Sequence, residues 1–189
     1  ILAPLLNLLN IDNCRPRSTN EVTGGVVRIA QMFLATNDAA TWGWDSVAGK
    51  IRLQRRADLV NNFVKSHIGN KKGNIKILEL GCGTGLFTEK LYNFSTWFFV
   101  SLDIYDGVIC KAVEKIKKTG KNNIFVVGDA EALPFIDGSF DVIVGISVLH
   151  HLQLDIALRN ISRILKTGGI FIFSEPNMLN PQILIQKNI

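Results

Sequence analysis

The stretch Ile77-Leu-Glu-Leu-Gly-Cys-Gly-Thr-Gly-Leu-Phe87 decides the fold of this 189-residue chain. It begins as an apolar run and passes directly into three glycines at alternate positions, Gly81, Gly83 and Gly85. Glycines at this spacing let the backbone approach a ligand without a Cβ collision and turn sharply from a buried strand into a helix. Dinucleotide-binding proteins carry G-x-G-x-x-G here, and the third glycine of that pattern corresponds to Leu86. A plain tight turn is the alternative interpretation of the loop.

From residue 75 onward, short apolar runs alternate with amphipathic stretches, which is typical of βαβ units and a parallel sheet. Because crossovers between parallel strands are right-handed, the pattern predicts a doubly wound, Rossmann-like α/β sandwich of three layers. Its ligand crevice would lie at the carboxyl ends of the strands. The predicted strands are 75–80, 97–103, 124–128, 140–149 and 169–174, and the predicted helices are 47–68, 106–118 and 154–165.

Two carboxylates stand where predicted strands end. Asp103 closes the second strand, where a carboxylate can accept hydrogen bonds from both hydroxyls of a ribose, although capping of the next helix is an alternative role for an Asp. Asp129 follows the third strand, within Gly128-Asp-Ala-Glu-Ala-Leu-Pro-Phe135. Beside the backbone of Ala130, it suits the amine and ring edge of adenine. The pair predicts an adenosine site at this edge of the sheet.

Taken in order, these motifs resemble those of class I methyltransferases that depend on S-adenosylmethionine (SAM). The matching features are Glu79-Leu-Gly-Cys-Gly-Thr-Gly85, the acidic end of the second strand, the 128–135 run with Asp137-Gly-Ser-Phe-Asp-Val-Ile-Val144 after it, and Leu165-Lys-Thr-Gly-Gly169. The resemblance covers residues 75–176 and is nearest to the small-molecule group that includes the ubiquinone and menaquinone methyltransferases. It implies SAM as the cofactor and a small molecule as the methyl acceptor, with the acceptor atom (O, N or C) left open.

The resemblance also implies a role for each site residue. Glu79 and the loop residues Gly81, Cys82, Gly83 and Gly85 would hold the methionine portion. Asp103 and Ile104 would hold the ribose and one face of the adenine, and Asp129 with Ala130 the adenine itself. Ser147 would lie beside the methionine amine or the sulfonium.

Methyl transfer from a sulfonium is an in-line displacement, so the protein mainly has to hold the acceptor atom close to the methyl carbon. An acceptor that carries a proton benefits from a base, and Val148-Leu-His-His-Leu152 supplies two histidines at the end of the fourth strand. In similar enzymes the second of these positions faces the reaction centre. We therefore predict His151 as the base and His150 as the second candidate. A structural imidazole is the alternative.

Motifs that are missing also favour a small acceptor. Methyltransferases that act on amines of DNA bases carry N-P-P-aromatic after the fourth strand, and cytosine-C5 enzymes use a Pro-Cys nucleophile, whereas this chain has Ser147-Val-Leu-His150. A nucleic-acid partner is disfavoured, although basic residues before residue 75 keep an RNA interaction open. Among them, Arg52, Arg55 and Arg56 share one face of the helix predicted at 47–68, which either meets an anion or is simply solvated.

The sequence suggests one boundary, which divides the chain into two segments. Residues 1–46 form an N-terminal segment that either makes a lid, with Trp42 and Trp44 as an apolar roof, or is partly disordered, and Met32 is an alternative start. Residues 47–189 form the SAM-binding domain. The resemblance implies two further strands after the fifth, so we expect a C-terminally truncated core with an open edge.

Composition limits the class of protein. Hydrophobic residues make up 47% and charged residues 20%, as in globular domains. Three cysteines without C-x-x-C spacing argue against a metal site and predict reduced thiols in the cytoplasm. The apolar run 1–11 is too short to cross a membrane. Besides methyl transfer, two functions stay open: a nicotinamide-dependent oxidoreductase, which Leu86 argues against, and a non-catalytic SAM-binding module. Nothing in the sequence indicates the oligomeric state.

Overall fold

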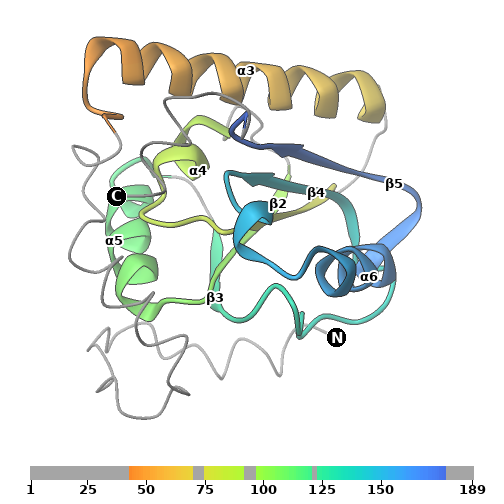
Figure 1. The fold of residues 1–189 in the computed structure, drawn as a ribbon. Coiled ribbons are helices and arrows are strands. Elements are labelled where there is room, and N and C mark those ends of the chain that lie inside the picture. The colour runs from red at the N-terminus through yellow and green to blue at the C-terminus, as the bar shows by residue number, and fades with distance from the viewer. Residues whose placement is uncertain (1–42, 70–74, 92–96, 121–122, 178–189) are drawn as a thin grey trace.

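The computed structural model describes residues 43–69, 75–91, 97–120 and 123–177 of the chain (Figure 1). Most of the predicted N-terminal segment, including Trp42 and Met32, lies outside these ranges. None of the described helices combines the length and the apolar character that a membrane crossing requires.

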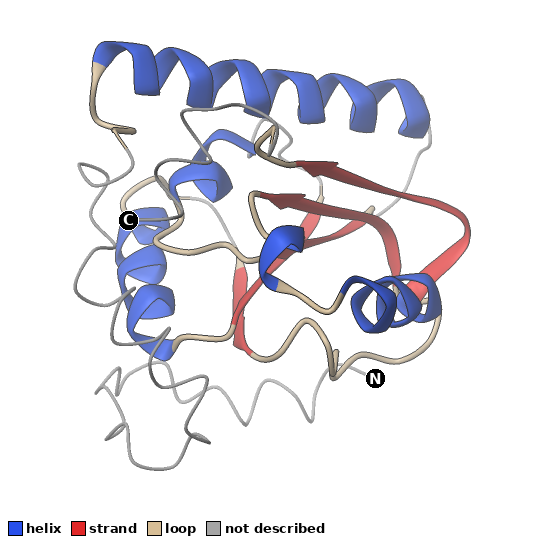
Figure 2. Ribbon diagram, viewed as in Figure 1, coloured by secondary structure: helices blue, strands red, loops and turns tan. Residues whose placement is uncertain are grey.

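Five parallel strands form one sheet in the order β3-β2-β1-β4-β5 (Figure 2). The central strand is β1, in which Leu78 lies between Val100 of β2 and Ile143 of β4. The order reverses between β1 and β4, as in a doubly wound fold, so the prediction of fold class is confirmed. The strands are β1 (Lys76–Leu80), β2 (Phe98–Asp103), β3 (Ile124–Val127), β4 (Phe140–Ile146) and β5 (Leu165–Ser174).

Helices cover both faces of this sheet. They are α3 (Val47–Ile68), α4 (Leu86–Leu91), α5 (Asp106–Lys117) and α6 (Leu154–Ile164), with a short 3-10 helix, η3 (Leu149–His151), between β4 and α6. The long helix α3 has its predicted bounds. Its first turn is capped by the Ser46 hydroxyl, which accepts from the Gly49 N–H at 3.0 Å, and it ends at Gly69 with φ of 53°.

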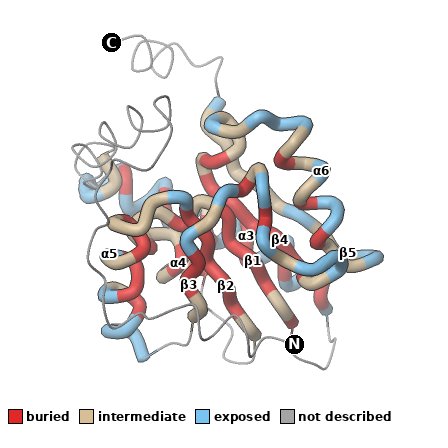
Figure 3. The backbone as a smooth tube through the Cα atoms, turned by 90° about the horizontal axis from the view of Figure 1, so that it is seen from below, coloured by how far each residue is buried: buried red, intermediate tan, exposed pale blue. Residues whose placement is uncertain are grey.

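Successive side chains of each strand point to opposite faces of the sheet, so the core has two parts, one on each face. One face carries Ile77 and Phe99, which pack with buried residues of α3, and α5 covers Phe125 on the same side. The other face carries Ile143, which packs with Ile161 of α6. Figure 1 shows α3 running along one side of the sheet and α6 lying on the other, and Figure 3 shows burial concentrated in the strands between them. Burial on both faces explains why β1, β2 and β4 read as continuous apolar runs rather than alternating ones.

The ends of β4 and β5 differ from the prediction. The fourth strand was expected at 140–149 but ends at Ile146, because Ser147 adopts a left-handed conformation with φ of 58° and the chain then turns into η3. The fifth strand was expected at 169–174 but starts at Leu165, and an irregular register between Phe140 and Val142 of β4 absorbs the extra residues. The preceding helix accordingly ends at Ile164 rather than 165, and α5 ends at Lys117 rather than 118.

The glycine loop after β1 touches the segment after β4. Gly81 has φ of 67°, and a Cβ atom added there would lie 2.6 Å from Cγ2 of Val148, closer than atoms can approach. Only glycine therefore permits both this backbone conformation and this contact. The close approach joins the two loops at the point where the strand order reverses.

Gly81→Ala should destabilise the fold by about 2–5 kcal/mol, the sum of about 1–2 for the left-handed backbone and about 1–3 for overpacking against Val148. Gly138→Ala is the matched control, because Gly138 has φ of 60° and no atom would lie within 4 Å of its Cβ. It should lose only the backbone contribution. Urea denaturation of both variants measures the difference, and equal losses would show that the contact with Val148 carries no cost.

Candidate active site

The crevice of a doubly wound sheet lies where the strand order reverses, outside the carboxyl ends of the strands. In this chain the reversal lies between β1 and β4. The loops that leave β1, β2, β3 and β4 carry the residues that the sequence predicted for the site. The contacts of each residue show which of them can meet a ligand.

The glycine loop is held against the end of β2 by backbone hydrogen bonds. The N–H groups of Gly81 and Cys82 both donate to the carbonyl of Leu102, at 2.8 and 3.1 Å. One residue further on, the Gly83 N–H donates to Oδ2 of Asp103 at 2.8 Å. The loop and the carboxylate at the end of β2 therefore form one rigid unit.

Asp103 is nearly buried, with 9% of its surface exposed. Its Oδ2 accepts from Gly83, and its Oδ1 accepts from the Tyr105 N–H at 3.1 Å. Burial raises the pKa of the Asp103 carboxyl, and these backbone hydrogen bonds oppose the rise. A carboxylate has about four acceptor positions, so each oxygen keeps room for a further donor such as a ribose hydroxyl. The neighbouring Ile104 is 42% exposed, as a side chain that contacts a ligand ring would be.

Glu79 faces the interior rather than the crevice. Its Oε2 accepts hydrogen bonds from the hydroxyls of Thr88 in α4 and Ser101 in β2, both at 2.7 Å. Burial raises the pKa of Glu79 to about 7, the hydroxyl hydrogen bonds lower it, and the nearby Asp103 charge raises it again. In this arrangement Glu79 braces the base of the glycine loop against α4 and β2.

The side chain of Cys82 also lies in the interior. It packs in the cluster formed by α5 residues, among them Ile109 and Ala112. Burial raises the pKa of this thiol well above its usual value, so it is not a reactive thiolate. Because the side chain points into the interior, only the backbone of Cys82 can face the crevice.

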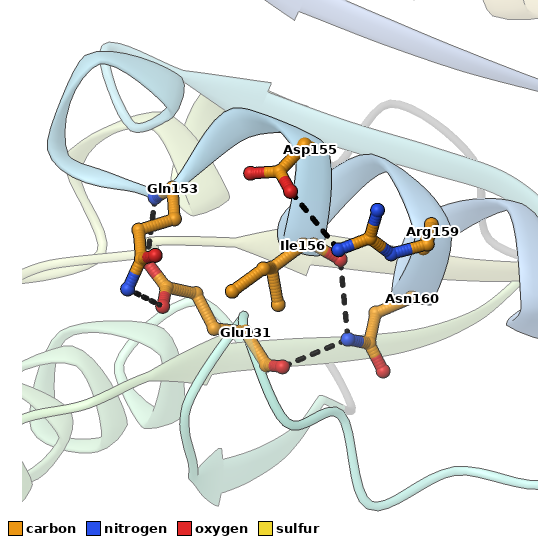
Figure 4. Close-up of polar contacts among 6 residues, drawn as sticks. All are labelled: Glu131, Gln153, Asp155, Ile156, Arg159 and Asn160. Atoms are coloured by element: carbon orange, nitrogen blue, oxygen red, sulfur yellow. Dashed lines mark hydrogen bonds and ion pairs between the residues drawn. The ribbon is translucent and has the colours of Figure 1, made fainter.

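The segment after β3 is tied to the start of α6, as Figure 4 shows. The carboxylate of Glu131 accepts from the backbone N–H of Gln153 at 2.6 Å and from its side-chain amide at 3.3 Å, while Asn160 donates to the Glu131 carbonyl at 2.8 Å. Just before Glu131, Asp129 is exposed and Ala130 is buried. Oδ1 of Asp129 accepts from the Glu131 N–H at 2.8 Å, so the predicted adenine contacts sit on a fixed turn.

Ser147, directly after β4, contacts the side chain of Arg56 in helix α3. Its N–H donates to the Ser174 carbonyl at 2.9 Å, and its hydroxyl accepts from Nη1 of Arg56 in α3 at 3.1 Å. Arg56 also lies 5.5 Å from the centre of the Trp44 ring. The half-buried Arg56 thus reaches the end of β4, whereas Arg52 and Arg55 of the same helix face are exposed. Trp44 packs edge-on against Phe87.

The two histidines have different surroundings. Nδ1 of His150 lies 2.6 Å from Oε2 of Glu175, and the two side chains are 15% and 26% exposed. His151 is exposed and ends η3, where its N–H donates to the Val148 carbonyl at 3.0 Å. The rings of the two histidines lie 4.0 Å apart, centre to centre.

Arg56 and Glu175 were not among the predicted site residues, although the sequence predicts that the tail from Glu175 onward lines the acceptor pocket, because it leaves the carboxyl end of the fifth strand. The sequence shows Arg56 only as one of three basic residues on a helix face, and Glu175 only as a residue after the fifth strand. Both reach the end of β4 through tertiary contacts with sequence separations of 91 and 25 residues. The signal available for Glu175 was its position directly after a strand, where Asp103 and Asp129 also stand.

The doubly wound sheet, with glycines after β1 and a carboxylate at the end of β2, defines an α/β protein of the Rossmann-like class. Residues 78–173, just over half of the chain, match the family described as "Methyltransferase domain". The chain belongs to this methyltransferase family, and its cofactor is SAM, as the resemblance implied.

Named relatives agree with this assignment. The ubiquinone/menaquinone biosynthesis C-methyltransferase UbiE of Pasteurella multocida is 36% identical over 152 residues, which cover 72% of this chain and 55% of that protein. The malonyl-[acyl-carrier protein] O-methyltransferase of Erwinia pyrifoliae is 33% identical over 106 residues, covering 55% of this chain and 38% of that protein. The chain therefore spans about half or less of these relatives.

A solved structure of the PH0226 protein from Pyrococcus horikoshii OT3 superposes with a TM-score of 0.64 at 27% identity. The match covers 77% of this chain and 62% of that one. The shared fold extends well beyond the glycine loop.

The buried Glu79 makes stability depend on pH. Its pKa is raised from 4.5 to about 7 in the folded chain, so the folded state binds a proton more tightly than the unfolded state. The protonated Glu79 carboxyl therefore contributes to the free energy of unfolding. This contribution is fully present below about pH 4.5 and is lost as the pH rises to about 7, and the loss amounts to about 3 kcal/mol. Glu79→Gln should remove that loss, so its free energy of unfolding should fall less than that of the wild type between these pH values.

Urea denaturation at steps between pH 4.5 and 7 measures both curves. Glu89→Gln is a control on the neighbouring helix, because Glu89 belongs to α4 but is not a buried carboxyl. Parallel curves for the wild type and Glu79→Gln would show that the Glu79 carboxyl titrates normally in the folded chain.

Proposed function

We propose that the protein containing this chain transfers a methyl group from SAM to a small-molecule acceptor. The observation that carries the proposal is the unit formed by Asp103 and the glycine loop, in which the carboxylate at the end of β2 accepts from the Gly83 N–H. That unit offers acceptors for a ribose beside a loop that admits close backbone approach. Membership of the methyltransferase family supports the same conclusion.

The residues present fit SAM. Asp103 retains acceptor capacity for the ribose hydroxyls, Ile104 is exposed beside it, and Asp129 with Ala130 lies on the fixed turn after β3. Glu79 supports the glycine loop from below, and Gly81, Cys82, Gly83 and Gly85 would meet the methionine portion through their backbone. SAM supplies a methyl group on a positively charged sulfur. The chain would bind and orient SAM. The carboxylates Glu79 and Asp103, near the ends of β1 and β2, favour a ligand with a positive charge.

The acceptor has to be held in line with the methyl group and, where it carries a proton, deprotonated. Ser147 and the histidines His150 and His151 lie after β4, on the side of the crevice away from Asp103. The assignment of His151 as base, with His150 as second candidate, stays a prediction. Relatives named for methylation of both carbon and oxygen leave the acceptor atom open.

Two other functions predict different ligands and products. A nicotinamide-dependent oxidoreductase would bind NAD, and Leu86 in place of the third glycine disfavours it. A non-catalytic SAM-binding module would bind SAM without forming S-adenosylhomocysteine. Metabolite extracts incubated with methyl-labelled SAM and the protein separate turnover from silent binding.

Location and partners follow from the same features. The described Cys82 is a buried free thiol, which supports a cytoplasmic location. The strand-end carboxylates and the absence of base-methylation motifs support a small acceptor rather than a nucleic acid.

The chain should bind SAM and S-adenosylhomocysteine and should not bind NAD, because the Asp103 unit and the glycine loop suit an adenosine joined to an amino acid. Isothermal titration calorimetry with each ligand tests this. Tighter binding of NAD than of S-adenosylhomocysteine would overturn the assignment.

Asp103→Ala should weaken binding of S-adenosylhomocysteine by about 1.5–3 kcal/mol, the usual contribution of hydrogen bonds to a charged group. The control is Asp155→Ala, because Asp155 is exposed and pairs only with Arg159 along α6. Circular dichroism must show a folded Asp103→Ala variant. A folded variant with unchanged affinity would remove Asp103 from the site.

A further inference from the structure

Glu175 follows β5 directly and reaches across to the segment after β4. Its Oε1 accepts from the backbone N–H groups of Val148 and Leu149, at 3.0 and 3.1 Å. Its Oε2 lies 2.6 Å from Nδ1 of His150. One carboxylate thus holds both the backbone and the imidazole of the η3 segment.

These contacts determine which nitrogen of His150 carries the proton. An ionised carboxylate only accepts hydrogen bonds, so Nδ1 has to donate to Oε2. In the neutral ring the proton then lies on Nδ1, and Nε2 keeps its lone pair. A carboxylate that fixes this tautomer and ring orientation is the arrangement by which a histidine is prepared as a general base.

We propose that Glu175 is a positioning residue that holds His150 as the Nδ1–H tautomer and so presents Nε2 as the proton acceptor for the methyl acceptor. The inference rests on the proposed methyl transfer and selects His150 over His151 as the base. His150 has such a carboxylate contact, with Nδ1 2.6 Å from Oε2 of Glu175. The base role belongs to His150, and Glu175 acts through it.

The surroundings of the pair favour this role over simple packing. Arg56 lies close enough for its charge to interact with that of Glu175, and its guanidinium donates to Ser147, next in the chain to Val148. Val148 in turn packs against Gly81 of the glycine loop. The His150–Glu175 pair is therefore positioned relative to the predicted cofactor loop through direct contacts.

Glu175→Gln gives a sharp test, because a glutamine has one acceptor and one donor end. The N–H groups of Val148 and Leu149 need an acceptor, so the amide oxygen should take the place of Oε1. The amide NH2 then faces Nδ1 of His150, which must accept, and the neutral ring should move its proton to Nε2. Nitrogen-15 NMR of the histidine rings in the whole chain distinguishes the two tautomers.

In the wild type we expect a pyrrole-type signal for Nδ1 of His150 and a pyridine-type signal for Nε2, and in Glu175→Gln the reverse. Asp155→Asn is the matched control, since it also turns a carboxylate into an amide near η3 but contacts only Arg159. It should leave the His150 signals unchanged. A wild-type neutral ring protonated at Nε2 would overturn the proposal even if Glu175→Gln failed to fold.

Turnover provides the second readout, measured as S-adenosylhomocysteine formed with a panel of phenols and catechols as acceptors. Glu175→Gln and His150→Gln should lower kcat by about 10²–10⁴-fold while the KM for SAM changes only a few fold, because general-base catalysis contributes about that factor. A fall in His151→Gln but not in His150→Gln would overturn the choice of base. If the wild type did not bind S-adenosylhomocysteine, the proposed function would be refuted, whereas the tautomer of His150 would be unaffected by that result.

Discussion

The hydrogen bond from the Gly83 N–H to Oδ2 of Asp103 is the constraint on which the ligand side of the molecule depends. It joins the loop after β1 to the end of β2, in addition to the two backbone bonds that the loop makes to Leu102. A loop with glycines at alternate positions has many accessible conformations, and these bonds select one of them. The same carboxylate keeps acceptor positions for a ligand, so under the proposed function the conformation of the loop and its affinity for a ribose would be coupled.

A second set of contacts fixes the other side of the crevice. The end of β4 has no regular continuation, since Ser147 is left-handed and the next two backbone N–H groups donate to Glu175 instead of to a strand. The two sides meet where Val148 packs against Gly81. The loop after β1 and the segment after β4 are therefore in direct van der Waals contact.

The sequence predicted the layers of this fold well because its three central strands, β1, β2 and β4, are buried on both faces. Such strands appear as uninterrupted apolar runs, and the crossover helices as regular amphipathic patterns, so the bounds of α3, β1 and β2 differ from the prediction by one residue at most. The positions of Asp103 and Asp129 near strand ends could be predicted for a similar reason, since both stand where an apolar run ends. The end of β4 was missed because Val148 and Leu149 are apolar and read as a continued strand, while the partner that draws them away, Glu175, lies more than 25 residues further along the chain.

The direction of the Glu79 side chain could not be predicted for a different reason. Alternation within β1 places it on the face that α4 covers, and the hydroxyls of Thr88 and Ser101 then enclose it. A family motif identifies the position but not which of its neighbours the carboxyl contacts. The raised pKa of Glu79 means that the folded chain is less stable at neutral pH than it would be with an uncharged side chain there. Burial raises the pKa of both Glu79 and Asp103, and the charge of Asp103 raises that of Glu79 further, so a ligand with a positive charge would favour the ionised carboxylates as it bound. The burial of these carboxylates therefore carries an electrostatic cost that a cationic ligand would lower, which would favour ligands with a positive charge.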